Sequence, residues 1–212
     1  MRDLDLQYWP RATFYQDMVQ LIQTLGASHG QEQTAVLLNA AELYLTHMLL
    51  DEAHSTLSGI TPEREDHIRR HQALSDAANL LDGQAVEDFE TSPLVATARA
   101  DASVLRSLQA IAVGDVGMLA SNIQGSFAGL GMQSRAVLRA MLPVFIEAAI
   151  ELRQETYADA AIRLMAELPD LASSSTGHFL RGRAHERRGN ESSALSAYFE
   201  AVNGWAYSYI TY

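Results

Sequence analysis

Residues 182–201 have the sequence GRAHERRGNESSALSAYFEA. This stretch predicts two short helices joined by a turn at Gly189 and Asn190. Gly182 and Ala194 are small residues twelve positions apart, one on each helix, where the two backbones can come close. Tyr198 follows Ala194 by one helical turn and supplies bulk on the same face. The pattern therefore predicts a closely packed helix pair.

The same order of small, small and large apolar residues occurs at two other places in the chain. It is found 34 residues upstream and again near the N-terminus, in the sets Ala148, Ala160, Leu164 and Ala41, Ala53, Leu57. In the second of these sets, Tyr44 stands three residues after the first small residue. Three occurrences of one spacing indicate a repeated structural unit.

This spacing resembles the tetratricopeptide repeat, a helix–turn–helix unit of about 34 residues. The chain departs from the family pattern at His178, Arg181 and His185, where the family has Trp, Leu and Tyr, and it lacks the closing Pro near Ala206. The resemblance implies an all-α fold, an α-solenoid of antiparallel helix pairs forming one repeat domain over residues 1–212. The best repeats are expected at about 34–60, 137–168 and 175–203, with irregular repeats over 61–135.

Apolar periodicity and capping residues predict individual helices. They are expected at about 11–25, 31–47, 50–57, 62–81, 134–153, 156–167, 175–188 and 191–202, with a further pair on either side of Gly114 and Asp115. Residues 84–91 are expected to form a poor helix. Gly125, Gly129 and Gly131 weaken any helix there, so a loop or frayed end is expected. No segment has sustained period-two alternation, so no sheet is expected.

Composition excludes several classes of function. The 212 residues carry a net charge of −11 and include no Cys, which excludes disulfides and thiolate metal sites. The acidic balance argues against nucleic-acid binding, and no apolar run is long enough to span a membrane. All fifteen basic residues are Arg, which suggests a GC-rich bacterial genome. A soluble protein is expected, and the sequence does not distinguish the bacterial cytoplasm from the periplasm.

Two pairs of side chains have spacings known from chemical sites. His67 and His71 are four apart on a predicted helix, but two Arg lie between them and would oppose a metal cation. Glu147 and Glu151 share a helix face, without a His or Asp nearby in sequence to support acid–base chemistry. A solvated helix face is the favoured interpretation for the His pair, and a charged outer or groove face is favoured for the Glu pair. No catalytic residue, metal site or cofactor is predicted.

Five residues are predicted to line a binding groove. Residues 181–212 carry four Arg and three acids, a net charge of +1 in an acidic chain. The resemblance places Phe179, Arg183 and Arg187 on the groove side of the first helix of a pair, and Phe145 and Arg153 at the same places one repeat earlier. Such a groove would take an acidic peptide or a C-terminal carboxylate. The alternative is a solvated face whose Arg pair with Glu186 and Glu191.

The leading hypothesis for function is a non-catalytic module that binds a protein segment in its concave groove. An alternative is a spacer or assembly slice of a longer repeat array, attached to domains not present here. A third hypothesis is an enzyme whose catalytic domain lies outside these residues. The aromatic residues Trp205, Tyr207, Tyr209 and Tyr212 predict a face that packs on a further repeat, on a second copy, or on a ligand.

Overall fold

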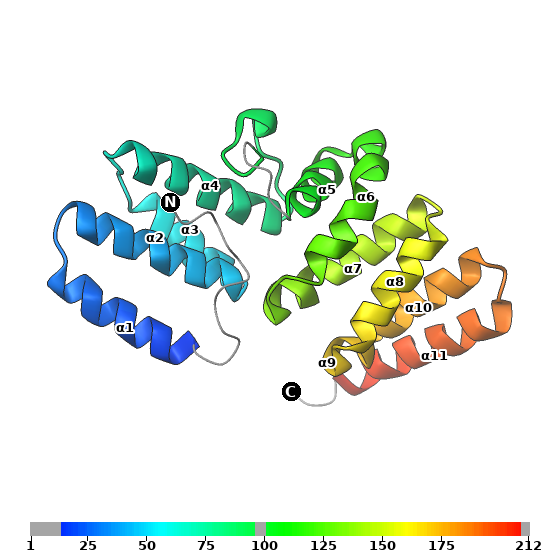
Figure 1. Ribbon diagram of the computed structural model, residues 1–212. Coiled ribbons are helices and arrows are strands. Elements are labelled where there is room, and N and C mark those ends of the chain that lie inside the picture. The colour runs from blue at the N-terminus through cyan, green and yellow to red at the C-terminus, as the bar shows by residue number, and fades with distance from the viewer. Residues whose placement is uncertain (1–13, 96–100, 209–212) are drawn as a thin grey trace. The chain divides into compact units, whose positions relative to one another are not determined.

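The computed structural model describes residues 14–95 and 101–208, with the backbone alone for 204–208 (Figure 1). Every regular element in these ranges is a helix, as the sequence predicts. In chain order they are α1 (Phe14–Ala27), α2 (Gln31–Thr46), α3 (Leu50–Ser58), α4 (Glu65–Leu81), the 3-10 turn η1 (Phe89–Thr91), α5 (Ala102–Val113), α6 (Val116–Leu130), α7 (Arg135–Glu151), α8 (Glu155–Ala166), α9 (Pro169–Ala172), α10 (Ser175–Arg187) and α11 (Glu191–Ser208).

Consecutive helices pack as pairs. The most extensive packing joins α10 with α11, α5 with α6, and α2 with α3, while α4 packs on both α2 and α3. The chain forms two compact units, unit 1 (Met1–Val137) and unit 2 (Leu138–Tyr212). Among the described helices, none combines the length and the hydropathy needed to cross a bilayer. One repeat domain over residues 1–212 stays a prediction.

Five helices end in the same turn, which sets the spacing of the repeats. The turn residue has a left-handed backbone with φ between 50° and 80°, and the next N–H bonds the carbonyl five residues back at 2.8–3.0 Å. This is the Schellman arrangement, which satisfies carbonyls left open at a helix end. The turn residues are Met48, Gly83, Gly114, Arg153 and Gly189. The intervals between these positions are 35, 31, 39 and 36 residues, which is consistent with a helical repeat of roughly the predicted length.

Four of these turns lead directly into a second helix, which begins two residues later. The four pairs can therefore be compared position by position. The fourth residue of the second helix is buried in each, as Ala53, Leu119, Ala158 and Ala194. On this basis Gly182, Ala194 and Tyr198 correspond to Ile146, Ala158 and Ile162, an offset of 36 residues.

The predicted set Ala148, Ala160 and Leu164 is therefore wrong by two residues. All three are only half-buried, whereas Ile146 is fully buried and Ala158 is 2% exposed. The one-turn helix α9 lies between α8 and α10 and lengthens this repeat beyond 34 residues. The set at Ala41, Ala53 and Leu57 is confirmed, since all three are at most 3% exposed.

Close approach between paired helices depends on small residues. A Cβ atom on Gly182 would lie 2.4 Å from Cε1 of Tyr198, so that ring packs directly on the α10 backbone. A Cβ atom on Gly125 would lie 2.5 Å from Oγ of Ser103, because α5 approaches α6 there. The loop or frayed end predicted around Gly125 and Gly129 is wrong, since α6 continues through both. Packing against α5 outweighs the low helix propensity of glycine.

The irregular middle of the chain has a specific cause. Gly83 forms the recurring turn, yet no α-helix follows it, and residues 84–95 contain only η1. The side-chain amide of Gln109 bonds both the N–H of Val86 at 2.8 Å and its carbonyl at 3.0 Å. This buried amide replaces the hydrogen bonds that a helix would have made. The expected short helix at 84–91 is reduced to one 3-10 turn.

Overpacking the α10–α11 contact should destabilise unit 2. Gly182→Leu is expected to lower the free energy of unfolding by about 1–3 kcal/mol, because Tyr198 already fills the space and its hydroxyl is held by Glu186. Ser192→Leu, at an exposed position of α11, should change it little. Urea unfolding followed by circular dichroism measures both. Equal losses in the two variants would contradict the close approach at Gly182.

Candidate functional site

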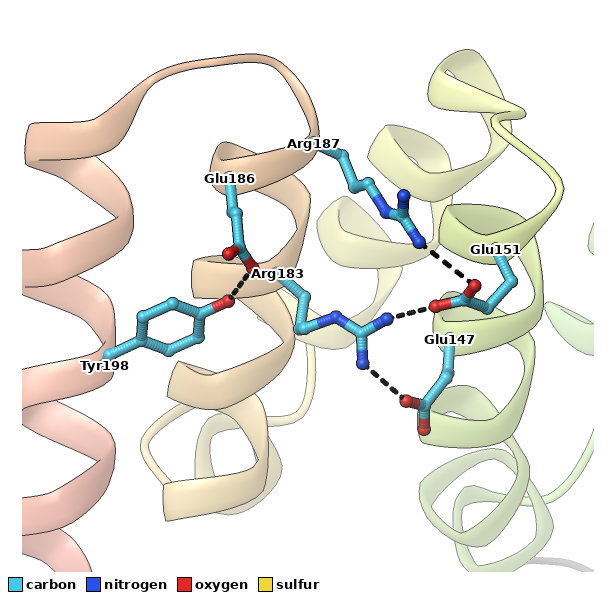
Figure 2. Close-up of polar contacts among 6 residues, drawn as sticks. All are labelled: Glu147, Glu151, Arg183, Glu186, Arg187 and Tyr198. Atoms are coloured by element: carbon cyan, nitrogen blue, oxygen red, sulfur yellow. Dashed lines mark hydrogen bonds and ion pairs between the residues drawn. The ribbon is translucent and has the colours of Figure 1, made fainter.

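The most extensive cluster of ionic contacts in unit 2 joins α7 to α10. Arg183 donates from Nη1 to Oε1 of Glu147 at 3.0 Å, and its other terminal nitrogen donates to Glu151 (Figure 2). Arg187 donates to the second oxygen of Glu151, also at 3.0 Å. We refer to Glu147, Glu151, Arg183 and Arg187 as the Arg–Glu ladder. It connects the first helices of two successive pairs.

The repeat explains why these four residues meet. Arg183 corresponds to Glu147 and Arg187 to Glu151 at the same 36-residue offset that relates the two helix pairs. Stacking places equivalent positions of successive repeats beside each other. Acids on α7 and Arg on α10 therefore attract instead of repelling. Unit 1 links its own first helices in a similar way, where Arg70 of α4 binds Glu42 of α2.

The ladder keeps one carboxylate ionised. A hydrogen bond from Arg187, with the positive charges of Arg187 and Arg183, holds the pKa of Glu151 below its usual range. A general acid working near neutral pH needs the opposite shift. The carboxylate pair at Glu147 and Glu151 thus serves an ionic contact between helices, in line with the favoured interpretation of it as a charged face.

A second polar contact lies on the other side of α10. The hydroxyl of Tyr198 donates to Oε2 of Glu186 at 2.6 Å, and the ring of Phe179 lies 5.8 Å from the Tyr198 ring (Figure 2). Burial, together with the hydrogen bond to Glu186, raises the pKa of Tyr198 to about 12. Glu186 therefore binds Tyr198. Arg183 and Arg187 bind Glu147 and Glu151 in place of Glu186 and Glu191, the partners that the alternative named.

A cleft of about 620 Å³ opens beside the ladder, between the end of α7, the start of α8 and the end of α10. Small and apolar side chains form its floor, and six charged residues line it: Arg153, Arg183, Arg187, Arg188, Glu155 and Glu186. Arg188 is bound to Asp159 of α8. Arg153 is the turn residue after α7 and is exposed. Among the described residues, no carboxylate pairs with Arg153.

The structure brings three of the five predicted site residues together. Arg153, Arg183 and Arg187 all line the cleft, although the ladder engages the last two. Phe179 is 40% exposed but packs on Tyr198 outside the cleft. Phe145 is fully buried, so it does not line a groove. A repeat of 34 residues makes Phe145 the position equivalent to Phe179 in the preceding helix pair. The observed offset of 36 residues makes Pro143 the equivalent position instead.

Sequence reasoning missed that Glu147 and Glu151 are the ladder's acidic half. The signal was available, since each lies 36 residues before an Arg of α10. The family period of 34 concealed it, because at that offset Arg187 corresponds to Arg153. One change of register therefore accounts for both the misplaced Phe145 and the overlooked carboxylates.

The two His of α4 hold helices together. Nδ1 of His67 lies 3.1 Å from Oε1 of Gln31 on α2, and Nε2 of His71 lies 3.0 Å from the carbonyl of Leu57 on α3. The two rings thus bond different helices. Within residues 14–95 and 101–208, no group of three or more His, Asp or Glu is arranged to hold a metal ion.

Comparison with protein-family models, with curated proteins and with solved structures gives no match to this chain.

The ladder should make stability depend on pH. The pKa of Glu151 is depressed in the folded state, so its contribution is present above the ordinary value of 4.5 and is lost as pH falls through the lower folded value. In urea unfolding between neutral and acidic pH, Glu151→Gln should lose less stability than the wild type. Glu200→Gln, outside the ladder, should behave as wild type. Identical pH profiles for all three proteins would contradict the role of Glu151.

Proposed function

We propose that this chain is a non-catalytic, tetratricopeptide-like module that binds an acidic protein segment or a C-terminal carboxylate beside the Arg–Glu ladder. The observation that carries the proposal is the position of Arg153. Arg153 lines a cleft within the size range of ligand sites, and it is exposed with no carboxylate partner among the described residues. Guanidinium groups bind carboxylates through paired hydrogen bonds.

The surrounding charges favour a shallow, salt-sensitive contact. Arg187 is 42% exposed and gives one terminal nitrogen to Glu151, so its remaining donors are open to a ligand. Arg183 is 22% exposed and donates to two carboxylates, which leaves it a supporting role. A bound carboxylate would sit between Arg153 and Arg187. Weak binding that falls as ionic strength rises follows from this geometry.

The electrostatics of the site support a binding role over catalysis. The pKa of Glu151 is lowered and the pKa of Tyr198 is raised to about 12. Neither group therefore exchanges a proton readily near neutral pH. The charged residues bond one another across helices and stabilise the packing. Such a site presents fixed charges to a partner.

A second function, that of one slice in a longer repeat array, is favoured by Phe179. It stands ten residues before its turn residue, the same position as Leu38 in α2. Leu38 is fully buried on a helix that contacts α1, α3 and α4, whereas Phe179 is 40% exposed. A helix pair packed after α11 would cover Phe179. The coding sequence that follows residue 212 tests this function, which requires a further amphipathic helix pair there.

Binding of acidic peptides should depend on Arg153. Peptides ending in two or three acidic residues are expected to bind at low salt, and Arg153→Gln should weaken them about tenfold, the loss of one charge-assisted contact. Arg163→Gln is the matched control, because Arg163 is an exposed arginine of α8 outside the cleft. Fluorescence anisotropy of labelled peptides, at low and high salt, measures the affinities.

The choice of Arg153 keeps the experiment clear of folding effects. Arg183 and Arg187 hold α10 to α7, so reversing their charges would place four acids together and disturb the fold. Arg153 has no such contact, and its loss should leave the unfolding curve unchanged. Absence of any salt-sensitive binder, or equal affinities for the wild type and Arg153→Gln, would argue against the proposed site.

A further inference from the structure

A second cleft in unit 2 lies between the two helices of the last pair. It has a volume of about 410 Å³, within the range of small-molecule sites, and its walls are α10 and the first half of α11. The α10 wall carries His178, Arg181 and His185, and the α11 wall carries Ser192, Ser193, Ser196 and Glu200. None of these residues belongs to the Arg–Glu ladder or to the cleft at Arg153.

The polar lining distinguishes this cleft from the preceding helix pair. At the 36-residue offset, the three α10 residues correspond to fully buried apolar residues of α7: Leu142, Phe145 and Ala149. Ser193, Ser196 and Glu200 likewise correspond to apolar residues of α8: Tyr157, Ala160 and Leu164. Positions that are apolar in one pair therefore carry hydrogen-bonding groups in the next. A polar face also occurs on terminal repeats, so the state of the individual groups decides between solvation and a ligand.

Arg181 is held in place without an acidic partner. Its Nη2 atom donates to the carbonyl of Ala172 at 2.6 Å and lies 3.0 Å from Nδ1 of His178. Among the residues whose side chains are described, no carboxylate pairs with Arg181, although Glu200 lines the same cleft. The Nε and Nη1 atoms of Arg181 have no partner there either. A fixed guanidinium with unused donors is suited to binding a phosphate group through paired hydrogen bonds.

The two histidines add donors on the same face of α10, since they stand three residues before and four residues after Arg181. A guanidinium nitrogen only donates, so Nδ1 of His178 accepts from Arg181 and the His178 proton is on Nε2. Nδ1 of His185 is buried and has no hydrogen-bond partner among the described residues. No contact at Nδ1 thus fixes the His185 tautomer, and Nε2 of His185, also without a described partner, is able to donate to a ligand.

The three serines leave their hydroxyl groups open. A serine within a helix can bond the carbonyl four residues back, as Ser121 does with Gly117 at 2.9 Å. Ser192, Ser193 and Ser196 make no hydrogen bond with any other described residue. They also stand in the first two turns of the 18-residue helix α11, whose dipole favours a negative charge nearby. The hydroxyl donors and the positive helix end both suit an anion.

Antiparallel packing of α10 and α11 orders these groups along the cleft (Figure 1). His185 and Ser193 each stand four residues from the turn residue Gly189, whereas His178 and Glu200 each stand eleven residues from it. One end of the cleft therefore offers donors alone, and Glu200 adds an acceptor at the other end. The two ends are about 10 Å apart along the helix axes. A small monoester with its phosphoryl group at the first end would reach Glu200 with a hydroxyl group.

We propose that the cleft between α10 and α11 binds the phosphate monoester of a small hydroxyl-bearing molecule. Arg181, His185 and the serines of α11 donate to the phosphoryl oxygens, and Glu200 accepts a hydrogen bond from a ligand hydroxyl. The Arg–Glu ladder and Arg153 take no part. This site therefore stands or falls independently of the peptide site.

Titration of isotope-labelled protein with glucose 6-phosphate, followed by two-dimensional NMR at low ionic strength, tests the proposal. Amide signals of α10 and α11 around the cleft should shift, while those around Arg153 stay in place. Inorganic phosphate should shift the same signals but bind several-fold more weakly, because it does not reach Glu200. The proposal would be overturned by no shift at this cleft, or by sulfate or a phosphoserine peptide binding as tightly as glucose 6-phosphate.

A double variant removes donors without removing a packing contact. Ser193→Ala combined with Ser196→Ala eliminates two hydroxyl groups at exposed positions, and alanine favours the helix. Affinity for glucose 6-phosphate should fall about tenfold, as expected for two lost hydrogen bonds. Ser55→Ala is the matched control, because Ser55 is an exposed serine at the position of Ser196 in α3. Unchanged affinity in the double variant, or an equal loss in Ser55→Ala, would refute the site.

Arg181→Gln tests the charged contact. It should weaken binding at least tenfold, because the group that binds the phosphoryl oxygens with a full charge is lost. Arg181 also bonds the carbonyl of Ala172, so urea unfolding followed by circular dichroism shows whether this variant stays folded. If it does not, the serine double variant decides alone. A folded Arg181→Gln that binds glucose 6-phosphate as the wild type does would refute the proposal.

Discussion

The turn that ends the first helix of each pair is the constraint on which the rest of this protein depends. A residue with positive φ lets the next N–H reach the carbonyl five residues back, which closes one helix and aims the chain into the next. Glycine takes that conformation readily, and Gly114 and Gly189 occupy it. Met48 and Arg153 adopt it without that freedom, which shows that the packed pair, and not the turn residue alone, fixes the geometry.

This turn determines which residues of the two helices in a pair face each other. The second helix begins two residues later, so its fourth residue always faces the first helix and is always buried. Small side chains at this contact bring the backbones together, and where the space is smallest only glycine fits, as at Gly182 beneath the Tyr198 ring. In unit 2 two such pairs, α7 with α8 and α10 with α11, lie next to each other. Stacking aligns equivalent positions of neighbouring repeats, and the Arg–Glu ladder is the electrostatic result.

The same stacking gives the surface its two distinct regions. Charged residues of successive first helices meet and neutralise one another, and Arg153 at the turn is left open beside the cleft they border. Second helices turn a polar outer face to solvent in α3 and α8, but a strongly apolar one in α11.

The sequence by itself determined the helices, the pairing and the approximate period, because these depend on local spacing: apolar residues along one face, Gly and Asn at a turn, and Gly182 twelve residues before Ala194. It also identified the arginines of α10. The tertiary structure alone decided which side chains contact each other. A one-turn helix, α9, lengthens the repeat, and the resulting two-residue change in register buries Phe145 and sets Glu147 opposite Arg183.

The burial or exposure of individual residues likewise could not be predicted from the sequence. A glycine in α6 lowers helix propensity locally, yet Gly125 is helical because α5 packs on it, and that contact joins residues far apart in the chain. An apolar triplet such as Leu195, Phe199 and Val202 has the same local pattern whether it faces a core or solvent. Only the packed helices show which face remains open, because exposure depends on neighbours that local spacing does not encode.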